Sequence, residues 1–185
     1  MLLLLVSCVS TEDEMQRRDR ARRLAADLAT LSPTVSKAEA QKLASTAVER
    51  SAELQRQWRP MHIAWANNAL INMCLQPRGL CYHWRDDTYP PLHHLHLRTL
   101  DVHLAAARRA TPREHNALVI TAHGQPFEEG IVLDGWRSGG PMAWKHVKKD
   151  KYPWKPLPWE ITPMELRPLI MPDRYPTPPA ANPPR

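Results

Sequence analysis

The chain has 185 residues, of which 43% are hydrophobic and 24% are charged. These fractions argue against an intrinsically disordered chain, and the length predicts one compact domain with tails. A formal net charge of +6 and a pI near 9.5 favour an anionic partner. That partner is nucleic acid, an anionic envelope polymer or a lipid headgroup, and charge alone does not choose among them.

The N-terminal string MLLLLVSC places an apolar run directly before Cys8. It resembles the lipobox of bacterial lipoproteins, whose cysteine is lipidated and becomes the mature N-terminus. The resemblance implies a signal over residues 1–8 and a lipid anchor on Cys8, which predicts a lipoprotein on the periplasmic face of the bacterial envelope, for example at the outer membrane. The alternative is an apolar end that is disordered or docks on the core. No other stretch approaches the roughly 20 apolar residues of a spanning helix.

A first helix is predicted over residues 12–30. Thr11 with Glu14 matches a capping box, and leucines follow at helical spacing. Many arginines occupy the other face of this helix. We interpret that face as solvated surface rather than as a binding site, because charge runs on helices are usually solvated.

A second, longer helix is predicted between Ser36 and Pro60. Ser36 with Glu39 repeats the capping signal, and an apolar stripe runs up to the helix breaker Pro60. The two helices together are expected to form a helical N-terminal extension over residues 9–59.

Two further helices are expected before the sequence changes character. Residues 61–75 carry apolar side chains at helical spacing, which predicts a largely buried third helix. The string CYHWRDD follows a loop that ends at Gly79, so it predicts a helix that begins at or next to Cys81. Exposed N–H groups and the helix dipole at that end stabilise a thiolate. Pro90 and Pro91 are expected to cut this helix short.

Antiparallel strands are predicted after residue 97. TLDVHLAAARR, EHNALVITA and GIVLDGW are short β-branched or alternating runs separated by turn signals, and MAWKHVKK adds a fourth strand. Helices followed by an antiparallel sheet indicate an α+β fold. A third of residues 153–185 are proline, so this Pro-rich tail is expected to be neither helix nor central strand, and instead extended or disordered.

Three residues with chemistry follow one another along these elements. Cys81 opens a helix, His115 opens the second predicted strand, and Asp134 ends the third. If those strands are neighbours, His115 and Asp134 lie side by side at the open end of a hairpin whose turn spans residues 124–130. A thiol nucleophile needs a base and a group that orients the base, so these three residues are candidates for those parts.

The strings RGLCYHW, EHNALVI and GIVLDGW resemble the core of the transglutaminase-like cysteine proteinases, including their bacterial periplasmic members. The resemblance implies a transglutaminase-like, papain-like domain over residues 60–152, with a catalytic helix packed on a sheet of three or four antiparallel strands. It implies that Cys81 is the nucleophile, His115 the general base and acid, and Asp134 the orienting carboxylate.

The substrate-binding residues are predicted with less help from the resemblance. Gln76 and Trp84 are candidates to complete the oxyanion hole, and Trp84 and Trp136 are candidates to wall a substrate cleft. The implied chemistry is acyl transfer through a thioester on a peptide, protein or cell-wall substrate, with no cofactor and no metal. Water as the acceptor gives a peptidase or amidase, and a lysine amine gives a cross-linking transferase.

Other interpretations remain open. Cys81 is alternatively a disulfide partner of Cys74 or a buried thiol, and the protein is then a catalytically inactive envelope lipoprotein that binds a protein partner or the cell wall. A histidine cluster suggests a metal site, but no ligand motif accompanies it. Residues 144–155 mix Lys with aromatics, as nucleic-acid binders do, but we prefer an ordinary solvated strand and turn. The histidines of the cluster are His93, His94 and His96, with His83 and His103 near them in the sequence.

Overall fold

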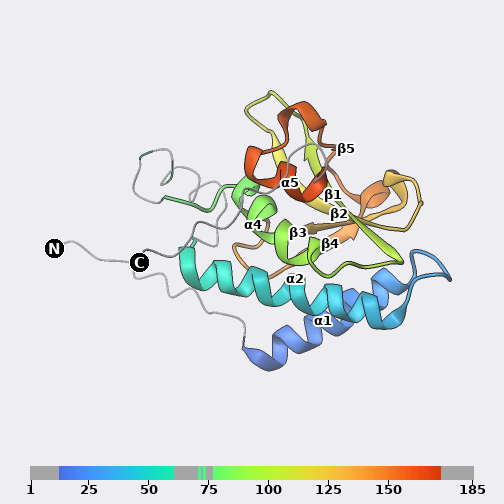
Figure 1. The fold of residues 1–185 in the computed structure, drawn as a ribbon. Coiled ribbons are helices and arrows are strands. Elements are labelled where there is room, and N and C mark those ends of the chain that lie inside the picture. Colours follow the sequence, from blue (N-terminus) through green and yellow to red (C-terminus); the bar gives the residue numbers. More distant parts are fainter. Residues whose placement is uncertain (1–12, 61–70, 72, 74–76, 172–185) are drawn as a thin grey trace, which may run out of the picture.

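The computed structural model describes residues 13–60, 71, 73 and 77–171, and these residues have the α+β architecture that the sequence predicts (Figure 1). Within these described residues, four α-helices accompany one antiparallel sheet, whose strand order is β4-β3-β2-β1-β5. The helices are α1 (Glu14–Ala29), α2 (Lys37–Trp58), α4 (Cys81–His93) and α5 (Arg167–Ile170). The strands are β1 (Leu100–Ala107), β2 (His115–Ala122), β3 (Ile131–Asp134), β4 (Ala143–His146) and β5 (Trp154–Pro156).

Several predictions concern parts of the chain outside the described residues. They are the signal over residues 1–8 with Cys8, the third helix over residues 61–75, and the side chains of Cys74 and Gln76. Within the described part of the chain, no helix is both long enough and apolar enough to cross a membrane.

Helix α1 begins at a different cap from the one predicted. Its N-cap is Asp13, whose side chain accepts a hydrogen bond from the Gln16 backbone N–H at 2.8 Å. The Gln16 side chain accepts one in return from the Asp13 backbone, which completes a capping box. The Thr11–Glu14 pairing is therefore wrong: Asp at an N-cap is as favourable as Ser or Thr, and the box lies two residues further on.

Helix α2 begins at the predicted cap, Ser36, whose side chain accepts from the backbone N–H of Glu39. The Glu39 carboxylate does not close the box. Instead it accepts hydrogen bonds from the backbone N–H groups of Arg98 and Thr99 and from the Thr99 hydroxyl. The start of α2 is thereby tied to the chain just before β1, and the Thr99 hydroxyl bond is the main reason that the pKa of Glu39 is lowered.

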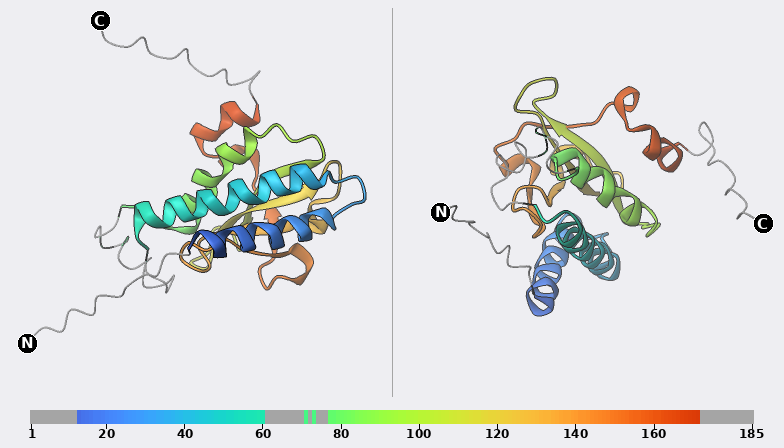
Figure 2. Two further views of the ribbon diagram at one scale, coloured as in Figure 1. Left: turned by 90° about the horizontal axis from the view of Figure 1, so that it is seen from below. Right: turned by 90° about the vertical axis from the view of Figure 1, so that its left-hand side faces the viewer.

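The three long helices cover one face of the sheet, as Figure 2 shows from the side. Alternate residues of the strands, such as Leu104, Leu118 and Leu133, share one hydrophobic core with buried residues of α1, α2 and α4. This core is continuous, so α1 and α2 pack on the same hydrophobic core as the sheet.

The opposite face of the sheet carries a second, smaller core. Ala117 and Val119 of β2 and Val132 of β3 pack there against Trp154, with Phe127 and Tyr152 at its margin. The alternation of strand side chains explains the division, because successive residues point to opposite faces. His115 belongs to the same alternating set as Ala117, whereas Asn116 belongs to the set that faces the helices.

The Pro-rich segment is more structured than predicted. Trp154–Pro156 forms edge strand β5 beside β1, with Ala107 opposite Trp154. An edge position suits proline, because its nitrogen, which carries no hydrogen to donate, faces away from the neighbouring strand. Arg167–Ile170 is a single helical turn with Pro168 near its start, where no intrahelical donor is needed. The prediction of no helix in this segment is therefore wrong.

Helix α4 continues through both of its prolines to His93, although we expected it to stop at them. Pro91 has no N–H to donate to the carbonyl of Asp87, four residues earlier. Arg50 of α2 supplies the missing donor, because its Nε lies 3.0 Å from that carbonyl oxygen. The helix thus tolerates Pro91 because a neighbouring helix satisfies the orphaned acceptor.

Candidate active site

Cys81 is the first residue of α4, as predicted, and it carries a free, half-buried thiol. The N-cap residue is Leu80, and in the described residues its own side chain accepts no hydrogen bond from the first turn of the helix. The backbone N–H groups of a first helical turn and the positive end of the helix dipole favour a negative charge at this position.

The loop that precedes Cys81 is fixed by His83. Its Nδ1 accepts hydrogen bonds from the backbone N–H groups of Gly79 and Leu80, at 3.1 and 3.2 Å. The nitrogen must be unprotonated to accept them. Burial and the nearby charge of Arg78 lower the pKa of His83, and both therefore favour this neutral form.

His115 and Asp134 lie side by side, as the hairpin prediction required. Strands β2 and β3 pair in the register Leu118 opposite Leu133, so Ala117 lies opposite Asp134 and His115 is its diagonal neighbour on the same face. The His115 Nε2 atom lies 2.6 Å from the Asp134 Oδ2 atom, and both side chains are buried.

His115 is protonated at neutral pH in this environment. Burial lowers the pKa of His115, but the hydrogen bond with Asp134, the negative charge of Asp134 and the proximity of Cys81 raise it to about 9. The second ring nitrogen, Nδ1, is buried and has no hydrogen-bond partner of normal geometry in the described residues. With Nε2 bound to Asp134, Nδ1 is the nitrogen left to exchange a proton with Cys81.

Aromatic rings enclose the imidazole of His115. The ring centroids of Trp136, Tyr152 and Trp154 lie 4.6, 4.7 and 5.3 Å from its own. Such packing restricts ring rotation and excludes water from the His115–Asp134 pair. The Trp136 ring is half-buried against His115, and its predicted role in walling a substrate cleft stays a prediction.

Arg137 holds the far side of the Asp134 carboxylate, a contact that sequence analysis missed. Its Nε lies 3.0 Å from Asp134 Oδ2, and its backbone N–H donates to Oδ1. The same guanidinium binds Asp150 at 2.7 Å, and Asp150 accepts from Trp154 Nε1 at 3.2 Å. This network holds the Asp134 carboxylate in the position from which it binds His115.

The turn after Asp134 is pressed against helices α2 and α4. A Cβ atom on Gly135 would lie 2.5 Å from Ser51 Oγ and 2.7 Å from an indole carbon of Trp84. The Ser51 hydroxyl donates to the carbonyl of Gly140 at 2.6 Å. Helix α2 therefore supports the loop that carries Asp134 and Arg137, although it supplies no member of the site itself.

Trp84 is buried in the core. It is 3% exposed and packs edge to face on Trp58, with ring centroids 5.0 Å apart. Its contact with the Gly135 backbone makes it a core residue between α2, α4 and the turn after β3. The prediction that Trp84 walls a substrate cleft gains no support from this burial and stays a prediction.

The rings of the histidine cluster do not converge on one point in the described structure. The His93 ring centroid lies 6.0 Å from that of His94 and 6.2 Å from that of His96, with the rings tilted edge to face. His103 bonds Thr121 at 2.9 Å instead. Across the described residues, no three His, Cys, Asp or Glu side chains converge as metal ligands do.

The segment 144–155 is not an open stacking surface. Trp154 is buried, and Tyr152 packs on His115. Trp144 donates from Nε1 to Asp27 of α1 at 2.6 Å. These aromatics stabilise the fold, which agrees with the interpretation as an ordinary strand and turn.

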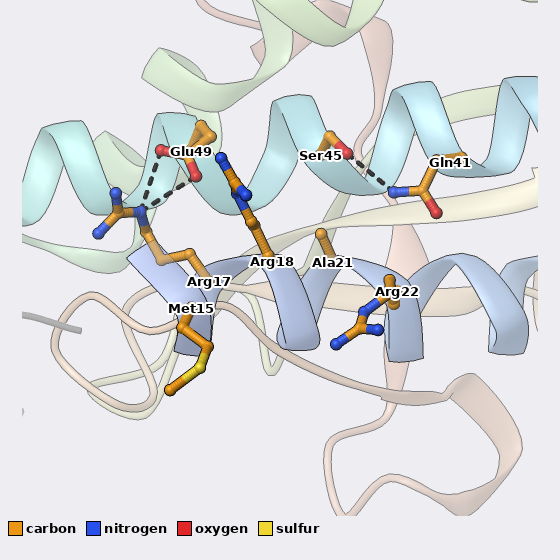
Figure 3. Close-up of a pocket in the computed structure, with 8 residues that line it drawn as sticks. All are labelled: Met15, Arg17, Arg18, Ala21, Arg22, Gln41, Ser45 and Glu49. Carbon is orange, nitrogen blue, oxygen red and sulfur yellow. Dashed lines mark hydrogen bonds and ion pairs between the residues drawn. The ribbon is translucent and has the colours of Figure 1, made fainter. Parts of the chain in front are cut away.

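A groove of about 470 Å³ lies between α1 and α2, away from Cys81, His115 and Asp134 (Figure 3). Arg17, Arg18 and Arg22 line it, and Arg17 is bound by Glu49 through both carboxylate oxygens. None of Cys81, His115 and Asp134 contributes to it. The groove therefore forms no part of the thiol site.

The site thus joins a thiol, an imidazole and a carboxylate in the order that nucleophilic acyl transfer requires. Sequence analysis missed Asn116, whose Nδ2 lies 3.8 Å from Cys81 Sγ. Its position directly after His115 was a signal that could have pointed to it. No family model, curated protein sequence or solved structure matches this chain.

Proposed function

We propose that the protein is a thiol hydrolase with a transglutaminase-like core, in which Cys81, His115 and Asp134 act together. The observation that carries the proposal is the buried His115–Asp134 pair, 2.6 Å apart, together with the free thiol of Cys81 at the start of α4, which Asn116, the neighbour of His115 on β2, contacts at 3.8 Å. A structural histidine needs only one partner. An imidazole between a carboxylate and a free thiol is the arrangement of a catalytic triad.

The resemblance to transglutaminase-like proteinases supports the same proposal. A helix that begins with the thiol packs on an antiparallel sheet, and the histidine and aspartate lie on adjacent strands of that sheet. Helices α1 and α2 and the chain after β4 lie outside the resemblance.

The first step is attack by sulfur. The imidazolium of His115 favours the thiolate of Cys81, whose sulfur forms a bond to the substrate carbonyl carbon while the carbonyl electron pair moves to oxygen. When that pair returns, the bond from carbon to the leaving amine breaks, and His115 gives its proton to the amine. The product is a thioester on Cys81.

The second step releases the acyl group. His115, now neutral, accepts a proton from water, whose oxygen attacks the thioester carbon. The carbon–sulfur bond breaks, the acid leaves, and the thiolate–imidazolium pair is restored. Asp134 stays hydrogen-bonded to Nε2 throughout and keeps Nδ1 directed to the reaction, while Arg137 keeps the carboxylate in place.

We place this activity in the bacterial envelope, with a lipid anchor on Cys8. The lipobox-like string supports the location, and a basic protein suits an anionic cell-wall or membrane surface. Mass spectrometry of the protein extracted from bacterial membranes tests the anchor. An acylated N-terminal peptide at Cys8 is expected, and an unmodified cysteine there contradicts the anchor without touching the thiol chemistry.

Acyl transfer is tested with p-nitrophenyl acetate, whose release of p-nitrophenolate follows formation of the thioester. We expect an acetyl group on Cys81 by peptide mass spectrometry, and loss of turnover in Cys81→Ala and His115→Ala. His103→Ala is the matched control, because His103 is also a strand histidine bound to a neighbouring strand. Equal rates in the wild type and Cys81→Ala would reject the enzyme and favour a binding scaffold.

A further inference from the structure

Asn116 is a buried polar residue that the triad does not use. It follows His115 on β2 and is 5% exposed. Because neighbouring strand residues face opposite sides of the sheet, its side chain faces α4 while His115 faces the smaller core. Both side chains interact with Cys81, because α4 begins where β2 begins.

The orientation of the Asn116 amide is fixed by Arg85. The Arg85 guanidinium, 5% exposed on α4, donates from Nη1 to the Asn116 Oδ1 atom. A guanidinium has no acceptor, so the amide oxygen and not its nitrogen must face Arg85. Asp86 in turn accepts from Arg85 Nε at 2.7 Å and compensates its charge.

The amide nitrogen consequently faces the thiol. One of its two hydrogens is used by Glu114, whose Oε1 lies 3.1 Å from Nδ2. The other is directed at Cys81 Sγ, 3.8 Å away. A sulfur contact of this length is weak, so this hydrogen has no strong acceptor before substrate binds.

An acceptor arises there during acyl transfer. When Sγ bonds to a carbonyl carbon, the oxyanion forms two bonds away from the sulfur. Cys81 is the first residue of α4, so its backbone N–H belongs to the first turn of the helix, where no intrahelical acceptor exists, and the Asn116 amide faces the sulfur from β2. Donors that already point at developing charge stabilise it without reorganisation.

We propose that Asn116 is the side-chain donor of the oxyanion hole and that Arg85 is the residue that positions it, an inference that rests on the proposed thiol hydrolase. Asn116 donates a hydrogen bond to the oxyanion and transfers no proton. It takes the part that sequence analysis assigned to Gln76 or Trp84. The indole of Trp84 is enclosed in the α2–α4 core, and Gln76 lies outside the described residues.

The test compares two reactions of the same sulfur. Alkylation by iodoacetamide displaces iodide and forms no oxyanion, whereas acetyl transfer from p-nitrophenyl acetate does. For Asn116→Ala we expect acetyl transfer to fall about 100-fold or more, while alkylation stays within about threefold of the wild type. Thr121→Val, another buried polar position on β2, is the control and should change neither rate.

Each other outcome is informative. An unchanged acetyl-transfer rate in Asn116→Ala, or equal losses in both reactions, would overturn the inference, because Asn116 would then be dispensable or would act on the sulfur itself. If Cys81→Ala also transfers acetyl at the wild-type rate, it is the proposed function that fails instead.

Arg85 is tested through its coupling to Asn116. We expect Arg85→Met to lower kcat with little change in KM and to add nothing further in the Asn116→Ala background. Thermal unfolding of the same variants separates this effect from loss of fold. Losses in kcat that multiply in the double variant would show that Arg85 does not act through Asn116.

Discussion

His115 and Asp134 form a buried hydrogen-bonded pair, with 2.6 Å between Nε2 and Oδ2, although 19 residues separate them in the chain. The pair is set by the register of β2 on β3, while Arg137 holds the carboxylate from the other side. Its strength should be visible in the stability of the protein as a function of pH.

The pKa of His115 is raised from 6.5 in the unfolded chain to about 9 in the fold, so the folded state binds the proton more tightly. The stabilisation is fully present below pH 6.5 and is lost as pH rises through about 9. It amounts to at most about 3 kcal/mol. The difference in Tm between wild type and His115→Gln should follow this curve, measured by circular dichroism.

The control for that prediction is Cys81→Ser, which removes the thiolate but leaves Asp134 in place. A reduced but persisting pH dependence in this background identifies Asp134 as a partner of the imidazolium. A Tm difference that is flat between about pH 6 and pH 10 would contradict the ion pair.

Alkylation of Cys81 by iodoacetamide should be fast at about pH 6, because the protonated His115 favours the thiolate. His115→Ala should slow it at least about tenfold at that pH, and His103→Ala should not. Peptide mass spectrometry without reductant reads the rate, with Cys74 as the internal comparison. Protection of both cysteines until reductant is added would instead indicate a Cys74–Cys81 disulfide and remove the nucleophile.

Gly135→Ala should destabilise the fold by about 1–3 kcal/mol, because its Cβ would meet Ser51 and Trp84 at 2.5 and 2.7 Å. Since the turn carries Arg137, acetyl transfer should fall as well.

Gly124→Ala is the comparison: its φ of +74° makes alanine strained there, but nothing lies within 4 Å of the new Cβ. It should lower stability by about 1 kcal/mol and leave catalysis unchanged. Wild-type stability and turnover in Gly135→Ala would show that α2 does not support the site.

Arg50→Ala should destabilise α4 by about 1–2 kcal/mol. The Asp87 carbonyl then loses the hydrogen bond from Arg50 that replaces the one Pro91 cannot donate. In a Pro91→Ala background the cost should shrink, since the restored backbone N–H satisfies that carbonyl. Urea unfolding of the four proteins measures the coupling. Glu53→Ala removes only the exposed partner of Arg50 and should have little effect. Strictly additive losses would contradict the compensation.

The sequence alone determined the order and type of most elements and the three candidate residues of the triad. Alternation with a period of two predicted the strands, and the turn between β2 and β3 placed His115 beside Asp134. Ser36 and the Gly79 loop marked helix starts. These are local signals, because a cap, a turn or a short hairpin is decided by residues close together in the chain.

Only the tertiary structure decided what surrounds the triad. Arg137 bridges Asp134 to Asp150, Arg85 turns the Asn116 amide towards the thiol, and Arg50 supplies the bond that Pro91 cannot make. The Arg85–Asn116 and Arg50–Asp87 contacts join segments whose separation is set by packing and not by a fixed spacing. A hydrogen bond between distant side chains leaves no period in the sequence, since any donor of suitable length can serve once the backbone brings it there.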